Sequence, residues 1–287
     1  MFRPDDVRFC QKLMRKHGVS YAFATRWFPR HMREATAVLY AFFRVPDDLV
    51  DEAHASEDER RKALLAWRQQ WRAAQEGGDS GHPVLRAAVE IFRVYKIPYR
   101  LGDDFLDAMT KDISTARYRA YADLEEYMYG SAAVVGIMMS YIIGYKNETT
   151  LVKAKALGEA MQLTNFLRDI MEDYDGRARV YIPQEDMLQF SVTDEDIREH
   201  AMTPGLIALL RFEIDRARTL YTKAESGIDE LAPEGRFAVR LASRLYAAIL
   251  TKIEQANYDV FHGRAKTSLF EKITIAYSVW RTTKNTQ

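Results

Sequence analysis

Apolar residues recur along most of the chain at the three- and four-residue spacing of α-helices, and the alternation typical of strands is nearly absent. Glycine and proline mark the breaks, most clearly in the segment 77–83. No long linker or repeat divides the chain, so the pattern predicts a single all-α domain covering residues 1–287. We predict its helices at residues 5–16, 30–52, 57–76, 83–95, 99–112, 123–145, 149–175, 204–229, 235–261 and 267–282.

Composition narrows the class of protein further. Lys+Arg and Asp+Glu both total 41, so no net charge points to a nucleic-acid partner. The single cysteine, Cys10, excludes an intrachain disulfide and is typical of a reducing compartment. The N-terminus lacks the apolar stretch of a signal peptide, and the most apolar run, residues 132–145, is shorter than the ~20 residues of a spanning helix. We expect a cytoplasmic protein and leave peripheral contact with a membrane open.

The first candidate for chemistry is an acidic motif near residue 50. Asp47 and Asp51 are four residues apart, so they share one face of a helix that Tyr40 and Arg44 extend. Two carboxylates one turn apart repel each other unless a cation lies between them. Mg²⁺ prefers oxygen ligands and commonly binds one or two carboxylates together with substrate phosphates. The motif therefore indicates magnesium and a phosphorylated substrate.

A second polar stripe crosses an otherwise apolar helix. Asn165, Asp169 and Asp173 step by four residues, and Gln162 lies one turn earlier on nearly the same face. Arg168 accompanies this stripe, and guanidinium groups bind phosphate oxygens through two parallel hydrogen bonds. Either motif alone could be a solvated acidic face. Two of them on separate apolar helices favour a metal and diphosphate site.

At these residues the chain resembles the squalene/phytoene synthase family, which joins two prenyl diphosphates head to head. The strongest match covers residues 162–183, followed by Tyr40 with residues 44–52. Weaker matches lie at 17–21, 111–118, 127–136 and 257–264. The resemblance implies a prenyltransferase with an isoprenoid-synthase helical bundle around a central apolar cavity.

The resemblance also implies roles for individual residues. Two or three Mg²⁺ ions, bound together with diphosphate, would be held by Asp47, Asp51, Asn165, Asp169 and Asp173. The expected catalytic residues are Tyr40, Arg44, Tyr129, Arg168 and Tyr246. The expected substrate-binding residues are Ser20, Tyr21, Thr25, Ala37, Arg44, Gln162, Asn165 and Tyr181.

The reaction implied is the condensation of two geranylgeranyl diphosphates to phytoene, through the cyclopropylcarbinyl compound prephytoene diphosphate, in carotenoid biosynthesis. Thr25 and Ala37 align with positions where thirty-carbon relatives carry bulky aromatic residues, and their small size favours the longer substrate. NADPH is not expected. The alternatives are a synthase that converts farnesyl diphosphate to dehydrosqualene, presqualene diphosphate or squalene, a terpene cyclase, and a non-catalytic helical partner protein. We expect a monomer or a weak dimer.

Three local features leave questions for the structure. Pro46 precedes the first acidic motif and, within a helix, removes a backbone hydrogen bond. The small residues of segment 130–136 permit either close helix packing or passage of a substrate chain. Arg264 follows the last cavity helix, and we rank a capping role for it slightly above a role in binding diphosphate.

Overall fold

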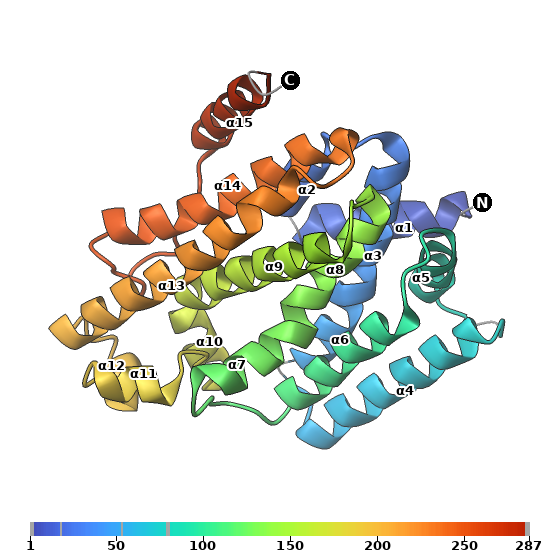
Figure 1. Ribbon diagram of the computed structural model, residues 1–287. Coiled ribbons are helices and arrows are strands. Elements are labelled where there is room, and N and C mark those ends of the chain that lie inside the picture. Colours follow the sequence, from blue (N-terminus) through green and yellow to red (C-terminus); the bar gives the residue numbers. More distant parts are fainter. Residues whose placement is uncertain (1–2, 18, 53, 79–80, 285–287) are drawn as a thin grey trace.

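The computed structural model describes residues 3–17, 19–52, 54–78 and 81–284 (Figure 1). In these residues every regular element is helical, which confirms the all-α prediction, and no helix among them is both long and apolar enough to cross a membrane. The elements are α1 Pro4–His17, α2 Val19–Thr25, α3 Arg30–Val50, α4 Glu57–Gln75, α5 Pro83–Val94, α6 Tyr99–Asp112, α7 Tyr121–Met128, η1 Tyr129–Ala133, α8 Val134–Ile143, α9 Glu148–Arg168, α10 Ile170–Arg177, α11 Gln184–Gln189, α12 Asp194–Arg198, α13 Pro204–Ile228, α14 Pro233–Gln255 and α15 Leu269–Lys284.

The observed helices differ from the predicted ones in three ways. The predicted helix 123–145 is interrupted by η1, a π-helical turn of the kind often found at functional sites. The predicted helix 149–175 breaks at Asp169. Backbone hydrogen bonds still continue across the break: the Asp169 amide donates to the Asn165 carbonyl oxygen (2.9 Å), and the Asp173 amide donates to the Asp169 carbonyl oxygen (2.8 Å). The short helices α2, α11 and α12 were not predicted, because five to seven residues are too few to establish a period.

Helix α9 runs through the middle of the molecule (Figure 1). It packs most extensively against α13 and also contacts α8, η1 and α14. On the other side of the bundle, α3 packs against α1, α4, α5 and α6 around a cluster of aromatic side chains. In this cluster Phe42 lies 4.7 Å from Trp71 and 5.7 Å from Phe92, measured between ring centroids. Helix α3 continues through Pro46 to Val50, so the proline does not end the helix before the first acidic motif.

Glycines allow α8 and α9 to approach each other closely. A Cβ atom on Gly136 would lie 2.4 Å from the carbonyl oxygen of Ala154, and one on Gly158 would lie 2.4 Å from that of Ala132. Both contacts are with backbone atoms, which cannot swing aside. The small residues of segment 130–136 therefore serve close helix packing, one of the two roles that the sequence leaves open.

This contact makes Gly158 sensitive to a single added methyl group. We expect Gly158→Ala to lower the free energy of unfolding by about 1–3 kcal/mol, because the helices must separate to admit Cβ. Gly176→Ala in α10 is the matched control: no atom lies within 4 Å of its added Cβ. That control should be neutral or stabilising by up to about 1 kcal/mol. Denaturant unfolding monitored by circular dichroism measures both, and equal midpoints for the two variants would contradict the packing argument.

Candidate active site

The two acidic motifs lie together where the C-terminal end of α3 meets α10. Burial, and then the carboxylate of Asp51, raise the pKa of Asp47 to about 7. Burial, then Asp169 and more weakly Asp51, raise the pKa of Asp173 to about 7 against the opposing effect of Arg177 and Arg179. Both raised pKa values therefore reflect burial first and the nearby carboxylates second. The Asp47 side chain still keeps 42% of its surface accessible, so solutes can reach it.

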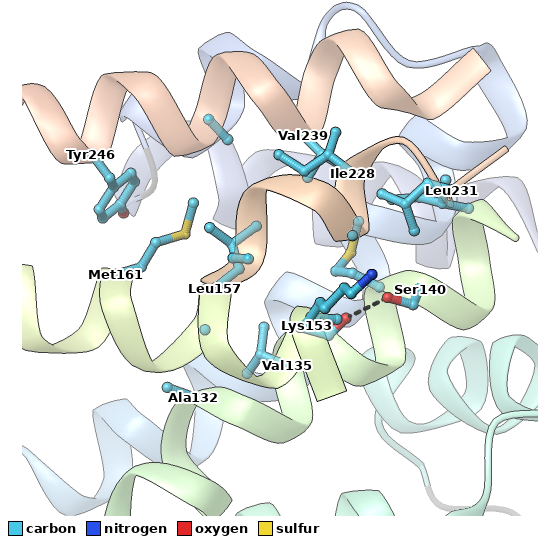
Figure 2. A pocket seen from close by; sticks show the side chains of 18 of the residues that line it. Ala132, Val135, Ser140, Lys153, Leu157, Met161, Ile228, Leu231, Val239 and Tyr246 are labelled. Carbon is cyan, nitrogen blue, oxygen red and sulfur yellow. Dashed lines mark hydrogen bonds between the residues drawn. The ribbon is translucent and has the colours of Figure 1, made fainter. Parts of the chain in front are cut away.

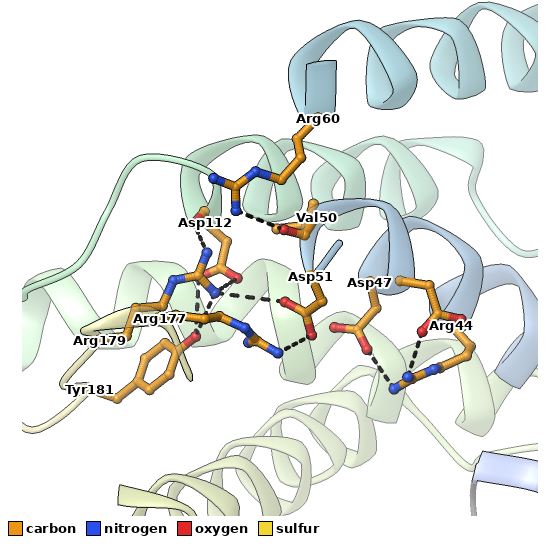
Figure 3. A network of polar contacts seen from close by, with 10 residues as sticks. Arg44, Asp47, Val50, Asp51, Arg60, Asp112, Arg177, Arg179 and Tyr181 are labelled. Carbon is orange, nitrogen blue, oxygen red and sulfur yellow. Dashed lines mark hydrogen bonds and ion pairs between the residues drawn. The ribbon is translucent and has the colours of Figure 1, made fainter. Parts of the chain in front are cut away.

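Arginines balance these carboxylates (Figure 3). Arg44 donates from Nη1 to Asp47 (2.9 Å) and its Nη2 lies 2.5 Å from Asp48. Arg177, which the sequence analysis did not single out, lies 2.6 Å from an oxygen of Asp51. These guanidinium groups lie beside the acidic motifs, where they could also bind a phosphorylated group.

Asp169 is bracketed by two guanidinium groups. Arg168 donates to both of its carboxylate oxygens, at 2.7 and 2.5 Å. Arg264 donates to the same two oxygens from Nε and Nη2, both at 2.9 Å. The capping role favoured for Arg264 was therefore wrong, since α14 already ends at Gln255 and the guanidinium bridges back to the second acidic motif.

A buried polar network lies beside the first acidic motif and supports it (Figure 3). Arg179, which is 4% exposed, donates to the Asp112 carboxylate (2.9 Å) and to the Asp112 carbonyl oxygen (2.6 Å). The Tyr181 hydroxyl donates to the other carboxylate oxygen of Asp112 at 3.2 Å, and its ring stacks 4.0 Å from that of Phe166. Arg179 Nη1 also lies 3.9 Å from Asp51. The structure thus gives Tyr181, expected to bind substrate, a place in this supporting network.

Asp112 and Arg179 were missed as functional candidates. Both lie inside segments that carry the family resemblance, 111–118 and 162–183, so the signal was present. Nothing in one sequence shows that these two residues, 67 positions apart, form a buried ion pair.

An apolar cavity of about 220 Å³ extends from the acidic motifs between α2, η1, α8, α9, α13 and α14 (Figure 2). Tyr246 lies at one end and Leu231 at the other, with Leu157 and Lys153 between them. Gln162 and Asn165 line the end that faces the motifs. This finding confirms the expected central apolar cavity.

Small residues form much of the cavity wall. Thr25 lines the cavity. Its hydroxyl donates to the carbonyl oxygen of Ala22 at 3.0 Å, so the polar group of this side chain already has a partner in the protein. Ser131, Ala132 and Gly136 also line the cavity, so segment 130–136 both permits close helix packing and forms part of the cavity wall. Ala37 is fully buried in α3 but is not among the cavity-lining residues.

The three tyrosines expected to be catalytic lie in two places. Tyr246 lines the cavity close to Arg168, and burial raises its pKa. Tyr40 is near Tyr246 and Arg44, and burial raises its pKa to about 12. The Tyr129 hydroxyl instead donates to Asp104 on α6 at 3.3 Å.

Two further expected substrate-binding residues, Ser20 and Tyr21, belong to α2. Their side chains lie outside the described part of the structure.

Comparison with known proteins identifies the family. A family model described as squalene/phytoene synthase matches residues 14–271. The chain is 31% identical over 287 residues to a phytoene synthase of Arthrospira platensis, with 94% of this chain and 91% of that protein covered. It is 32% identical over 270 residues to a phytoene synthase of Thermus thermophilus, with 93% and 90% covered.

Solved structures agree with these sequence relatives. A crystal structure of a dehydrosqualene synthase in complex with a ligand matches with a TM-score of 0.91 at 29% identity, covering 98% of this chain and 97% of that one. The squalene synthase HpnC from Alicyclobacillus acidocaldarius matches with a TM-score of 0.81 at 28% identity, covering 89% and 95%. This chain therefore belongs to the squalene/phytoene synthase family of prenyltransferases.

Proposed function

We propose that this enzyme condenses two molecules of geranylgeranyl diphosphate, head to head, to phytoene through prephytoene diphosphate. The observation that carries the proposal is the apolar cavity that leads from the two acidic motifs along α9. The curated relatives named above are phytoene synthases and cover more than nine tenths of this chain, which supports the same reaction in carotenoid biosynthesis.

The length of the cavity suits a twenty-carbon chain. The cavity lining on α9 runs from Thr150 to Asn165, fifteen positions, which is about 22 Å at the rise of an α-helix. An extended chain advances about 1.2 Å per bond, so the main chain of a geranylgeranyl group spans about 18 Å and that of a farnesyl group about 13 Å. The cavity wall on α9 is therefore long enough for the geranylgeranyl chain and exceeds the farnesyl chain by about 9 Å.

Magnesium fits the residues of the site. All the candidate ligands offer oxygen, and the Asn165 amide oxygen is buried without a hydrogen-bond partner. Among the residues that the structure describes, no three carboxylate, imidazole or thiolate side chains lie close enough together to hold a metal on their own. We infer that diphosphate oxygens complete the coordination begun by Asp47, Asp51, Asn165, Asp169 and Asp173.

The chemistry begins when the allylic carbon–oxygen bond breaks and its electron pair leaves with diphosphate. Bound Mg²⁺ would supply positive charge for that leaving group. In our proposal Arg44 and Arg168 bind diphosphate oxygens and hold the leaving group on the motif side of the site. The double bond of the second substrate then attacks the allylic cation, and loss of a proton, which the released diphosphate can accept, closes the three-membered ring of prephytoene diphosphate. Departure of the second diphosphate, rearrangement and loss of a second proton give phytoene, while the apolar wall keeps water from quenching the cations.

Tyr40 and Tyr246 are suited to the carbocation end of the site. Their raised pKa keeps both phenols protonated at neutral pH, so neither offers a phenolate to capture the cation. The faces of the aromatic rings can stabilise positive charge without forming a bond to it. We propose this role for the two tyrosines, whereas Tyr129 is held by Asp104.

A thirty-carbon reaction from farnesyl diphosphate is the second candidate. The structural match to a dehydrosqualene synthase, with a TM-score of 0.91, favours it. The same motifs would ionise either substrate, because they contact the diphosphate and not the far end of the chain. The choice between the two therefore depends on the cavity.

Product analysis tests the proposed function. We expect purified protein with Mg²⁺ to convert geranylgeranyl diphosphate to a forty-carbon conjugated triene, equally well with or without NADPH, and to lose the activity when EDTA removes the metal. Liquid chromatography with mass spectrometry identifies the hydrocarbon. Squalene formed from farnesyl diphosphate only in the presence of NADPH would overturn the proposal.

Asp173→Ala should remove turnover while circular dichroism shows unchanged helicity.

The supporting network predicts a second result. Asp112→Asn leaves the buried Arg179 without its counter-charge, and we expect a loss of about 3 kcal/mol in the free energy of unfolding. We also expect at least tenfold lower turnover, because Arg179 helps to place Asp51. Asp107→Asn on the same helix is the matched control, because its pair with Arg68 is 58% exposed on the carboxylate side and should contribute less than about 1 kcal/mol. Similar stability and turnover in both variants would contradict the supporting role.

The cavity wall opposite Tyr246 includes Lys153, and we predict that this residue limits chain length. The Lys153 side chain packs against Gly227, and its Nζ pairs with Glu230 at 2.6 Å. We expect Lys153→Ala to increase use of a twenty-five-carbon prenyl diphosphate relative to geranylgeranyl diphosphate by about tenfold. Lys153→Met keeps the length of the side chain without its charge and should retain the original preference. Competition assays measure the ratio, and an unchanged preference in Lys153→Ala would place the limit elsewhere.

A further inference from the structure

A second pocket, of about 410 Å³, lies beside the first acidic motif, between the start of α4, the end of α6 and the segment 176–179. Asp51 forms part of its wall, whereas Arg44 and Asp47 do not. Among the residues that the structure describes, none lines both this pocket and the apolar cavity. We call it the arginine pocket, because three arginines line it: Arg60, Arg177 and Arg179.

The three guanidinium groups reach the pocket from separate elements (Figure 3). Arg177 ends α10, Arg179 follows it, and Arg60 lies in the first turn of α4. Arg60 Nη1 donates to the carbonyl oxygen of Val50 at 3.3 Å. Its Nε is buried and makes no hydrogen bond within the described part of the chain. A buried N–H group without an acceptor is costly, so this atom points to an oxygen ligand that the protein does not itself supply.

Positive charge exceeds negative charge around the arginine pocket. The Asp51 carboxylate lies 2.6 Å from Arg177 and 3.9 Å from Arg179. Asp112, behind Arg179, pairs with the same guanidinium at 2.9 Å. Two carboxylates therefore face three guanidinium groups. No carboxylate of the described residues lies within ion-pair distance of Arg60, so its charge is available to an anion.

The rest of the wall favours a small anion over a prenyl chain. The side chains of Ser114 and Thr115 add two hydroxyl groups, and the apolar side chains are limited to Ile113 and Ala116. A Cβ atom on Gly176, which also lines the pocket, would have no atom within 4 Å, so this side of the pocket is open. Guanidinium groups bind phosphate oxygens through parallel hydrogen bonds. The pocket is therefore suited to an anion with several phosphate oxygens and no apolar tail.

We propose that the arginine pocket binds inorganic diphosphate, the leaving group of the reaction, on the side of Asp51 away from Asp47. Asp51 belongs both to the first acidic motif and to this wall, so one side chain separates the place where diphosphate is released from the pocket. The pocket gives the anion a polar way out that avoids the apolar cavity. The identity of this ligand rests on the proposed function, whereas the presence of an anion site does not.

Titration calorimetry of the full chain with inorganic diphosphate, in EDTA and without any prenyl substrate, tests the proposal. Failure here is thus distinct from failure of the condensation reaction. We expect Arg60→Gln to weaken binding about tenfold, because a charged donor is lost. Arg61→Gln is the matched control: it removes the same charge from the same helix, but Arg61 pairs with Glu57 at 2.7 Å. Its affinity for diphosphate should equal that of the wild type, and Arg60→Lys should retain most of the binding.

A second variant covers the case in which Arg60→Gln fails to fold after losing its contact with Val50. Ser114 is exposed at the rim, so Ser114→Asp adds a negative charge without disturbing the core and should also weaken diphosphate binding about tenfold. Diphosphate affinity equal to the wild type in a folded Arg60→Gln or Ser114→Asp protein, or no binding by the wild type, would overturn the proposal.

A third measurement separates the free anion from the head group of a substrate. An unreactive geranylgeranyl diphosphate analogue, with sulfur in place of the bridging oxygen, should bind in the presence of Mg²⁺ equally well to the wild type and to Arg60→Gln. If Arg60→Gln weakened this analogue as much as inorganic diphosphate, the pocket would be part of the substrate site, and its assignment to the released anion would be wrong.

Discussion

The active site depends on one buried ion pair, between Asp112 at the end of α6 and Arg179 in the segment after α10. Arg179 donates to both the side chain and the backbone of Asp112, so the contact fixes the position of the guanidinium as well as its charge. From there Arg179 reaches Asp51 on α3. One guanidinium therefore connects three parts of the chain, and Arg177 adds a second link between α10 and Asp51. A buried pair of this kind contributes specific geometry more than net stability.

Ion pairs with arginines explain why a site with so many carboxylates can fold. Burial and then Asp51 raise the pKa of Asp47, and burial and then Asp169 raise the pKa of Asp173, which is an energetic cost in the folded protein. Arg44 and Arg177 offset part of that cost by pairing with Asp47 and Asp51. A cation and a diphosphate bound together would offset more of it. The site is thus arranged so that binding its ligands relieves repulsion that the protein alone compensates only in part.

The sequence allowed correct prediction of the features that depend on local periodicity. The main helices and the all-α class follow from apolar spacing, and the stripes of Asp47 with Asp51 and of Asn165 with Asp173 follow from steps of four. The features that escaped prediction are set by contacts between distant segments. The π-helical turn η1 lies where Gly130 meets α6, and Arg264 returns to Asp169 across 95 positions. Such pairings leave no periodic signal in a single sequence.

The low solubility of the proposed product in water sets a further condition on the cavity. Moving an apolar chain into water costs about 0.8 kcal/mol for each CH₂ group, so releasing a forty-carbon hydrocarbon into water would cost on the order of 30 kcal/mol. The cavity has to be dry to protect the cation, and the same dryness holds the finished hydrocarbon in place. A product this apolar can leave only into another apolar phase. The wall that Ala24, Ala238 and Ala242 form separates the cavity from α15 by small side chains only. The requirement that excludes water during catalysis therefore also governs how the product can leave.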